Sequence, residues 1–360
     1  AEQEGFGYYQ TTQINGKMCS AAKAYLVPAL ERDNLTVLTD TQVNKILIDG
    51  SHAKGVECIG SDSNSFTIHA SKEVILSSGA FGSPQILLRS GVGPANEIVR
   101  HGINHLVDLP GVGKNLQDHI DYITVHKYSS MKLIGFSLKN IFFKYPYEIL
   151  KYLFTKTGLF TSTIAEAGAF IKTKDELDIP NIQFHYAPAM IVDHGRTLLW
   201  GTGMSCHSCL LRPKSLGEVT LASADPFADP LIDPKFLSHP DDMKDMIDGY
   251  KVMMRVLGSE PFSKYITEHT QRPIDINNDA DIEQAMREGA DTVYHPVGTC
   301  KMGDDDMYVV DSRLKVHKLN GLRIVDASIM PTIVGGNTNA PTIMIGEKAS
   351  DMILEDWNIH

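Results

Sequence analysis

The feature that most constrains the fold is a strand–loop–helix pattern near the end of the sequence. Residues 322–328 (Leu-Arg-Ile-Val-Asp-Ala-Ser) predict a buried strand that ends in the carboxylate of Asp326. The Gly-rich stretch 331–342 predicts a loop that opens a helix, because Asn339 is a good N-cap and Pro341 suits a first turn. Unpaired N–H groups and the helix dipole at such a start favour an anion. The pattern therefore predicts an α/β fold with an anion-binding loop at a strand end.

A second polar stretch, Tyr294-His295-Pro296-Val297-Gly298-Thr299, precedes this unit. The imidazole of His295, the amide of Asn337 and the helix N-terminus would together suit acid–base chemistry on a polar substrate beside an electron-rich cofactor. Spacing alone leaves a structural role open, since a His before Pro is often structural and Asn-rich loops are often turns.

Residues 73–93 form a third informative stretch. Residues 73–80 predict a buried strand ending in small residues, which let a phosphate or ribose approach the backbone. A helix is predicted next, with Ser83 as its cap, Pro84 in its first turn and Gly91 at its end. Between this stretch and the amino end, residues 35–38, 43–48, 56–59 and 66–69 predict strands.

The stretches 79–93 and 294–342 resemble the two sequence signatures of the glucose–methanol–choline (GMC) flavoprotein oxidoreductases. The resemblance implies FAD as cofactor, His295 as the base or polarising group for an alcohol, Asn337 as its second polar residue, and the following helix facing the flavin. Residues 110–119 resemble a family stretch near the cofactor, in which Asp118 and His119 are expected to be structural. The implied cofactor-binding residues are Val43, Ala80, Asp326, Ala327, Asn337, Thr338, Asn339 and Pro341.

Two residues are predicted to contact substrate. Tyr294 adjoins His295, and Glu166 matches the glutamate that binds the trimethylammonium group in choline-oxidising relatives. The neighbour Ala165 does not supply the aromatic face that strengthens a cation site, so choline ranks below neutral alcohols. The structural alternative for Glu166 is a buried, hydrogen-bonded sheet residue.

The resemblance also implies the domain organisation. An incomplete GMC-type FAD-binding domain, residues 14–120 and 290–360, interleaves with a substrate domain, residues 1–13 and 121–289, built as a mostly antiparallel sheet backed by helices. We find no Gly-x-Gly-x-x-Gly dinucleotide fingerprint in the sequence. We therefore expect the C-terminal portion of a GMC enzyme, which binds FAD weakly alone and has the N-terminal segment or a second copy as its partner.

Composition and charge limit the partners and the cellular location that we expect for the protein. The formal net charge of −11 and the pI of about 5.7 argue against a nucleic-acid partner. Five cysteines in 360 residues do not suggest a disulfide framework, and a cytoplasmic location is expected.

Residues 131–154 mix aromatic and aliphatic residues with lysines, which suits a helical cap over the substrate pocket or a peripheral contact with the inner membrane. Because Pro146 would interrupt one long amphipathic helix, the cap is preferred.

Cys206 and Cys209 have the spacing of zinc or redox cysteines. A zinc site usually needs a second pair, and alternation in a strand would send the two thiols to opposite faces. We therefore expect a strand here and no metal.

The sequence thus predicts oxidation of a primary alcohol to an aldehyde by hydride transfer to flavin N5, with electrons passed to a quinone or another acceptor. The closest resemblance is to bacterial FAD-linked alcohol dehydrogenases. The alternatives are a choline dehydrogenase or oxidase, and a non-catalytic fragment that does not hold FAD.

Overall fold

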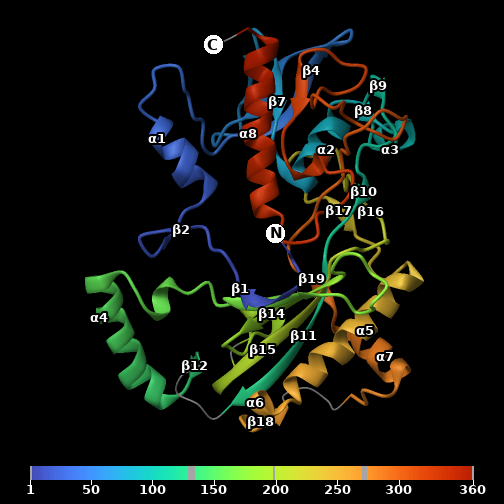
Figure 1. Ribbon diagram of the computed structural model, residues 1–360. Helices are drawn as coiled ribbons and strands as arrows, with labels where there is room; N and C mark the ends of the chain where they lie inside the picture. Colours follow the sequence, from blue (N-terminus) through green and yellow to red (C-terminus); the bar gives the residue numbers. More distant parts are fainter. Residues whose placement is uncertain (1, 129–133, 198, 270–273, 359–360) are drawn as a thin grey trace. The chain divides into compact units, whose positions relative to one another are not determined.

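The computed structural model describes residues 2–128, 134–197, 199–269 and 274–358. The chain divides into two compact units, each assembled from separated stretches of sequence. Unit 1 comprises Ala1–Leu35, Ile120–Arg212 and Pro240–Val293, and unit 2 comprises Thr36–His119, Pro213–His239 and Tyr294–His360. Figure 1 shows that unit 2 combines blue and red segments, which lie far apart in the sequence.

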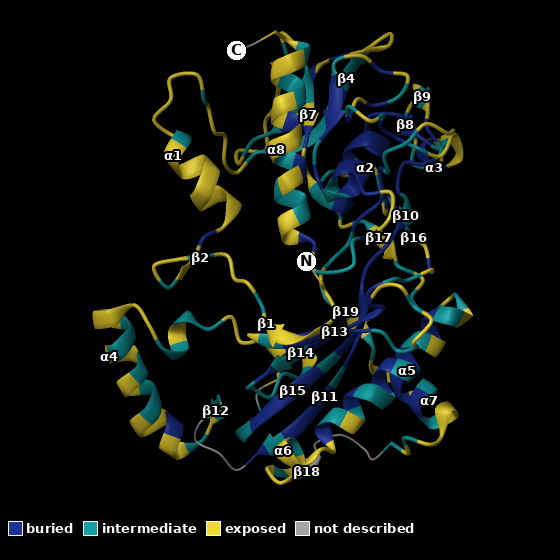
Figure 2. Cartoon of the chain, in the orientation of Figure 1, coloured by how far each residue is buried: buried dark blue, intermediate teal, exposed yellow. Residues whose placement is uncertain are grey.

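Unit 1 is built on an antiparallel sheet in the order β1-β13-β14-β15-β11-β18, with β12 paired to β15 and β19 to β11. The strand bounds are β1 Gly5–Tyr8, β11 Ile120–Tyr128, β12 Gly135–Phe136, β13 Ala167–Ile171, β14 Ile182–Ala187, β15 Gly201–Leu210, β18 Ile266–His269 and β19 Asp291–Thr292. The central strands β11, β14 and β15 are mostly buried (Figure 2).

Helix α5 (Pro240–Leu257) packs against β14 and β15 and contacts α7 (Asp279–Gly289). Its buried side chains recur at helical spacing, which is the pattern of a helix with one core-facing side. The remaining elements of unit 1 are the hairpin β2 (Gln13–Ile14) and β3 (Lys17–Met18), and the helical segments η1 Ala22–Leu26, α1 Val27–Ala29, η2 Asn140–Lys144, α4 Tyr145–Thr155, η3 Leu159–Thr161, η4 Asp193–Gly195 and α6 Glu260–Ser263.

Unit 2 contains a parallel pair, β7 (Val74–Leu76) with β20 (Leu322–Ile324), and an antiparallel sheet of β4 (Gln42–Asp49), β5 (His52–Ile59) and β6 (Ser65–His69). Smaller groups are β10 (Lys114–Leu116) with β16 (Gly217–Thr220) and β17 (Leu231–Asp233), and β8 (Val92–Gly93) with β9 (Val107–Asp108). Its helices are α2 (Gly79–Arg89), α3 (Ala95–Val99), the short η5 (Ala327–Ile329) and α8 (Asn339–Asp356). The predicted mixture of α/β elements with a separate antiparallel sheet is confirmed. Residues 35–38 lie outside any strand, so the strand predicted there is wrong.

The compact units depart from the expected domain pieces at two places. Residues 14–35 group with unit 1, where Gly16 and Lys23 line one pocket together with Thr155 and Lys156. Residues 213–239 group with unit 2, because β16 pairs with β10 and the N–H of Leu221 donates to Glu97 at 2.9 Å. Neither pairing has a local signal in the sequence, since both join segments far apart.

Helix α2 begins earlier than predicted. It starts at Gly79, in a left-handed conformation (φ +77°), so that Ser83 and Pro84 lie inside the helix and not at its start. The carbonyl of Ala80 would normally accept from the N–H that Pro84 lacks, and it accepts instead from the Thr299 hydroxyl at 2.6 Å. Thr299 thereby ties the loop after His295 to α2.

Proline is also accommodated at Pro146. The wide π-helical turn η2 leads directly into α4, whose first turn contains Pro146. The predicted interruption of the helix at Pro146 is therefore wrong. Within the described residues, no helix combines the length and apolarity needed to cross a bilayer.

Candidate active site

His295 is held by its backbone before its side chain makes any contact. The preceding residue, Tyr294, has a left-handed backbone (φ +66°), which is uncommon for a bulky side chain, and Pro296 restricts the residue before it. The N–H of His295 donates to the carboxylate of Asp118 at 2.9 Å. The direction in which the imidazole projects is therefore fixed within unit 2.

The imidazole of His295 lies between two other polar side chains of unit 2. Its Nδ1 is 2.9 Å from Nδ1 of His119, and its Nε2 is 3.3 Å from the side-chain nitrogen of Asn337. The two rings meet edge to face, with an interplanar angle of 89°. The far nitrogen of His119, Nε2, is 3.1 Å from the carbonyl oxygen of Val334. The predicted pairing of His295 with Asn337 is present, and His119 is a third member that the sequence placed among structural residues.

This chain of contacts determines which nitrogen of each neutral ring carries the proton. A carbonyl only accepts, so Nε2 of His119 donates to Val334 and Nδ1 of His119 is left as an acceptor. Nδ1 of His295 must then donate to His119, which leaves the lone pair of His295 on Nε2. The amide nitrogen of Asn337 donates to that lone pair. His295 is thus oriented as a base at Nε2.

The same stretch that carries His119 fastens the two loops of the site together. The backbone of Gln117 bonds in both directions to Val297, at 3.1 and 2.9 Å. Its side-chain amide donates to the carbonyl of Pro331 at 3.1 Å and accepts from the N–H of Ile333 at 3.1 Å. Gln117 therefore sets the spacing between the loop of His295 and the loop of Asn337.

Helix α8 begins immediately after the Asn337 loop. Thr338 occupies the N-cap position and accepts at its carbonyl from the N–H and hydroxyl of Thr342, at 3.0 and 2.7 Å. Asn339 is the first helical residue and not the predicted cap, and Pro341 lies in the first turn as predicted. The side chain of Thr338 makes no capping hydrogen bond to this N-terminus. An 18-residue helix therefore begins beside Asn337 with backbone N–H groups and a positive dipole end suited to an anion.

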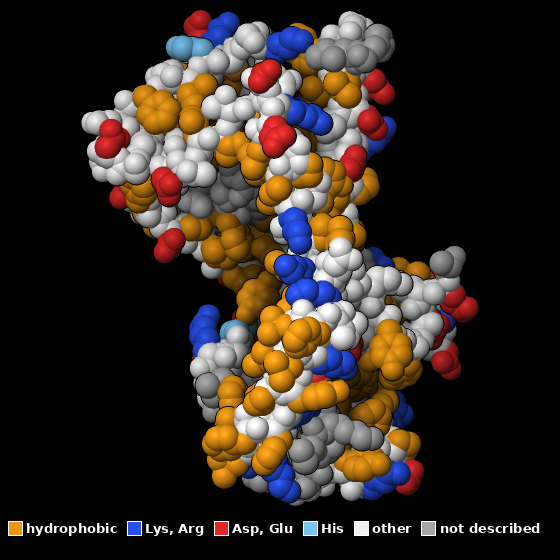
Figure 3. Space-filling model, turned by 90° about the vertical axis from the view of Figure 1, so that its left-hand side faces the viewer, with side chains coloured by type: hydrophobic (Ala, Val, Ile, Leu, Met, Phe, Trp, Pro, Cys, Tyr) orange, Lys and Arg blue, Asp and Glu red, His pale blue; other side chains and the backbone are white. Residues whose placement is uncertain are grey.

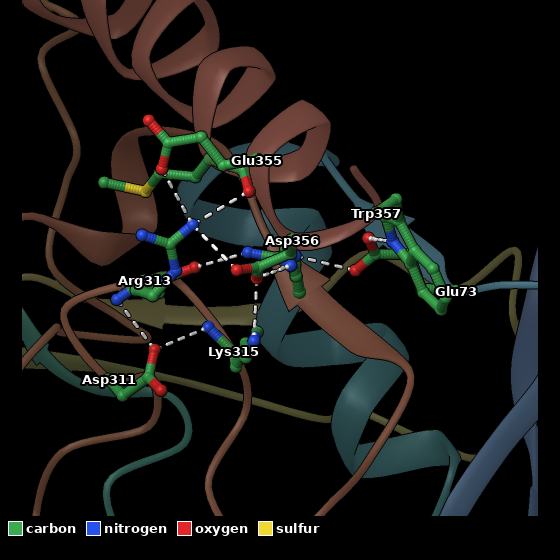
Figure 4. A network of polar contacts seen from close by, with 9 residues as sticks. Glu73, Asp311, Arg313, Lys315, Glu355, Asp356 and Trp357 are labelled. Carbon is green, nitrogen blue, oxygen red and sulfur yellow. Dashed lines mark hydrogen bonds and ion pairs between the residues drawn. The ribbon is translucent and has the colours of Figure 1, made fainter. Parts of the chain in front are cut away.

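The opposite end of α8 is anchored by the ion-pair network in Figure 4. Arg323, only 2% exposed, pairs with Glu73 at 2.7 Å and with Asp356 at 2.5 Å. Trp357 donates to Glu73 at 2.6 Å. Hydrogen bonds from Lys315 and Arg323 hold the pKa of Asp356 well below its usual range. These cations offset an acidic residue at a helix C-terminus, where the dipole disfavours it.

Four predicted cofactor residues lie elsewhere in unit 2, namely Val43, Ala80, Ala327 and Asp326. The carbonyl of Val43 accepts from Arg89 at 3.3 Å, and the carbonyl of Ala327 accepts from the N–H of Gly298 at 3.3 Å. Ala80 is buried in the first turn of α2. Their contact with a cofactor stays a prediction.

Asp326 is also satisfied by the protein. Its carboxylate accepts from the N–H of Gly79 at 2.9 Å, the hydroxyl of Ser83 at 2.5 Å and the N–H of Ser328 at 2.8 Å. The side chain thus joins β20 to the N-terminus of α2. The contact of Asp326 with a cofactor stays a prediction.

The predicted substrate residues are both exposed, but they belong to different units. Tyr294 belongs to unit 2 and adjoins His295. Glu166 belongs to unit 1, where its carbonyl accepts from the N–H of Tyr9 at 2.8 Å just before β13 begins. The alternative of a buried sheet role for Glu166 is wrong, because the residue is exposed and precedes the strand.

The two cysteines with zinc-like spacing are buried in β15, as the strand interpretation predicts. Burial raises the pKa of Cys206, which keeps its thiol protonated. Across the described residues, no cluster of three His, Cys, Asp or Glu side chains is placed to hold a metal.

Comparison with known proteins shows which family the chain resembles. Two family models, both described as GMC oxidoreductase, match residues 1–121 and 213–346. An alcohol dehydrogenase [acceptor] of Pseudomonas putida is 43% identical over 98% of this chain, and an oxygen-dependent choline dehydrogenase of Brucella anthropi is 39% identical over 98%. The chain spans 64% of the length of each of these relatives.

Solved structures show the same relationship. A formate oxidase of Aspergillus oryzae, determined in a study of its FAD modification, superposes with a TM-score of 0.91 at 26% identity and covers 100% of this chain and 67% of its own. A fungal aryl-alcohol oxidase has the same fold, with a TM-score of 0.85 at 24% identity over 99% of this chain and 67% of its own. FAD is the cofactor of this family. The chain belongs to the GMC oxidoreductase family.

Proposed function

We propose that this chain carries the catalytic residues of an FAD-dependent dehydrogenase that oxidises a primary alcohol to the aldehyde. The observation that carries the proposal is the hydrogen-bonded chain from Val334 through His119 to His295, which leaves Nε2 of His295 as an acceptor beside Asn337. A base with its lone pair on a defined nitrogen is what deprotonation of a hydroxyl requires.

The roles of the residues follow from their atoms. Nε2 of His295 takes the hydroxyl proton of the alcohol, while Nδ1 keeps its hydrogen bond to His119. The ring is then an imidazolium with donors at both nitrogens, and the acceptor on His119 suits that form as well. When the alcohol binds, Nε2 of His295 would accept from its hydroxyl in place of Asn337, and the amide of Asn337 would donate to the alcohol oxygen as negative charge builds on it.

The residues at the start of α8 fit the flavin end of FAD. This helix N-terminus, where the Thr338 side chain makes no cap and the first turn has no acidic residue, would stabilise negative charge on the flavin ring. When bound, FAD supplies the acceptor for the hydride that leaves the alcohol carbon. The chain's own residues would hold the alcohol oxygen and take its proton. The electrons would leave to a quinone or another acceptor.

Neutral primary alcohols are the proposed substrate class. Choline is less favoured, because Glu166 is solvent-exposed and its neighbour Ala165 offers no aromatic face. In the flavin-loaded enzyme, Glu166→Gln should leave the KM for neutral alcohols nearly unchanged. A kcat/KM for choline above that of every neutral alcohol would reverse this order.

Rapid-mixing measurement of flavin reduction by a panel of alcohols tests the proposal. His295→Ala in the flavin-loaded enzyme should slow reduction by about 10² or more while flavin content changes little. His69→Ala, an exposed histidine on β6, is the matched control and should have no effect. Unaltered reduction in the His295 variant would show that this histidine is structural.

A further inference from the structure

The helical segment formed by η2 and α4 presents a row of apolar side chains to solvent. Figure 3 shows hydrophobic side chains gathered on this side of the molecule. The row, called here the α4 face, consists of side chains that are each more than half exposed: Leu138, Phe142, Phe143, Tyr147, Leu150, Leu153 and Phe154. Exposed apolar patches of this kind mark sites of interaction with other molecules or with membranes.

A lysine-lined pocket lies at the C-terminal end of α4. It has a volume of about 730 Å³, and its cationic lining consists of Lys17, Lys23 and Lys156. The β2–β3 hairpin reaches this end of the helix through the hydrogen bond from Gln13 to Thr161. Thr155 and Lys156 line the pocket and directly follow Phe154, so the pocket adjoins the α4 face within unit 1.

The charge of these segments is opposite to that of the whole chain. Residues 134–165 contain four lysines and one acidic residue, Glu148, which gives a formal charge of +3. Residues 5–30 contain Lys17 and Lys23 and no acidic residue, which gives +2. The chain as a whole carries −11. The carboxylate of Glu148 accepts from the N–H of Leu159 at 2.8 Å, so it is directed toward its own loop.

We propose that the α4 face and the lysine pocket form a peripheral membrane-binding surface for anionic phospholipids. Apolar side chains would enter the boundary between headgroups and acyl chains, and the lysines would contact the anionic headgroups. A second copy of the chain is a poorer occupant, because a symmetric contact through this surface would bring two sets of lysines together. The proposal does not depend on the proposed catalytic activity, because it uses none of the residues placed in the candidate active site.

Vesicle flotation tests the proposal without any enzymatic readout. The purified chain should float with vesicles of mixed phosphatidylcholine and phosphatidylglycerol, and bind much less to phosphatidylcholine alone. Raised salt should weaken the binding, because screening acts on exposed charges. Equal binding to both kinds of vesicle, or to neither, would overturn the proposal.

Two sets of substitutions separate the apolar and ionic parts. The triple change Phe143→Ser, Leu150→Ser and Phe154→Ser should abolish binding to both vesicle types. The control Phe227→Ser, an exposed phenylalanine of unit 2, should bind like the unaltered chain. Unchanged binding by the triple variant would exclude the α4 face as the contact.

The lysines have a matched control as well. Lys17→Gln, Lys23→Gln and Lys156→Gln together should weaken binding to anionic vesicles by about 10²-fold, since each lysine near an anionic surface contributes roughly fivefold. In the control, Lys54, Lys244 and Lys348, which are also exposed, are all changed to Gln. Its fold-loss in binding to anionic vesicles should be less than a fifth of that of the pocket variant. Equal losses in the two sets would show that only the overall charge matters, and the pocket would then have no role.

Light scattering of the same variants distinguishes a second copy from a membrane. If the unaltered chain is a dimer that the apolar triple variant converts to a monomer, and it does not float with vesicles, the surface is a subunit interface and the proposal is wrong.

Discussion

Replacing His119 tests whether this residue sets the orientation and tautomer of His295. In His119→Ala, Nδ1–H of His295 loses its acceptor, and the bond from His119 to the Val334 carbonyl is lost as well. Leaving a buried donor without its partner costs about 1–3 kcal/mol. If that cost destabilises the orientation in which Nε2 of His295 faces the alcohol, flavin reduction should slow by about 5- to 160-fold. Each 1.36 kcal/mol corresponds to a tenfold change in rate.

The assay is rapid-mixing flavin reduction at saturating and limiting alcohol. Because His119 acts through His295, the loss should appear in the rate constant for reduction more than in the alcohol concentration at half saturation. His119→Asn should recover part of the rate, since the asparagine side chain places an acceptor near the position of Nδ1. The loss should also be smaller than that of His295→Ala.

Two results would refute this reasoning. One is a His119→Ala enzyme that reduces its flavin at the unaltered rate. The other is a His119→Asn enzyme no faster than His119→Ala although both fold and hold flavin equally, because the position would then act by packing alone.

Three further predictions concern stability. Thr299→Val should lower the free energy of unfolding by about 1–3 kcal/mol in urea titration, because the buried Ala80 carbonyl loses its donor; an unchanged midpoint would contradict this. Arg323→Met should cost about 3–5 kcal/mol in the same titration, since it leaves Glu73 buried without its cation; Glu73→Gln in addition should recover part of the loss. The folded pKa of Asp356 is depressed, so its contribution is complete above about pH 4 and is lost as the pH falls further; Asp356→Asn should flatten acid unfolding in that range, and an identical acid profile would argue against it.

The strand and helix content of the site could be predicted in large part because its signals are local. Alternation predicted β5 and β6, and the Gly-rich loop predicted the start of α8 to within one residue. The start of α2 could not be predicted in this way. A serine followed by proline normally begins a helix, and here the missing N–H of Pro84 is compensated by Thr299, which is more than 200 residues away in the sequence.

The partnership of His119 and His295 had no local signal either. The two histidines are 176 positions apart, and Gln117 brings them together by bonding to both loops of the site. The stretch 110–119 indicated proximity to the cofactor, which was the available clue. Only the folded contacts give the direction of each hydrogen bond, and with it the tautomer of each ring.

The most direct test of this account is a measurement of the histidine tautomers by ¹⁵N NMR with labelled histidine, using His295→Ala and His119→Ala to assign the signals. With both rings neutral, the account predicts a proton on Nδ1 and none on Nε2 for His295, and the reverse arrangement for His119. A proton on Nε2 of neutral His295 would contradict it, because that nitrogen could not then accept the proton of an alcohol.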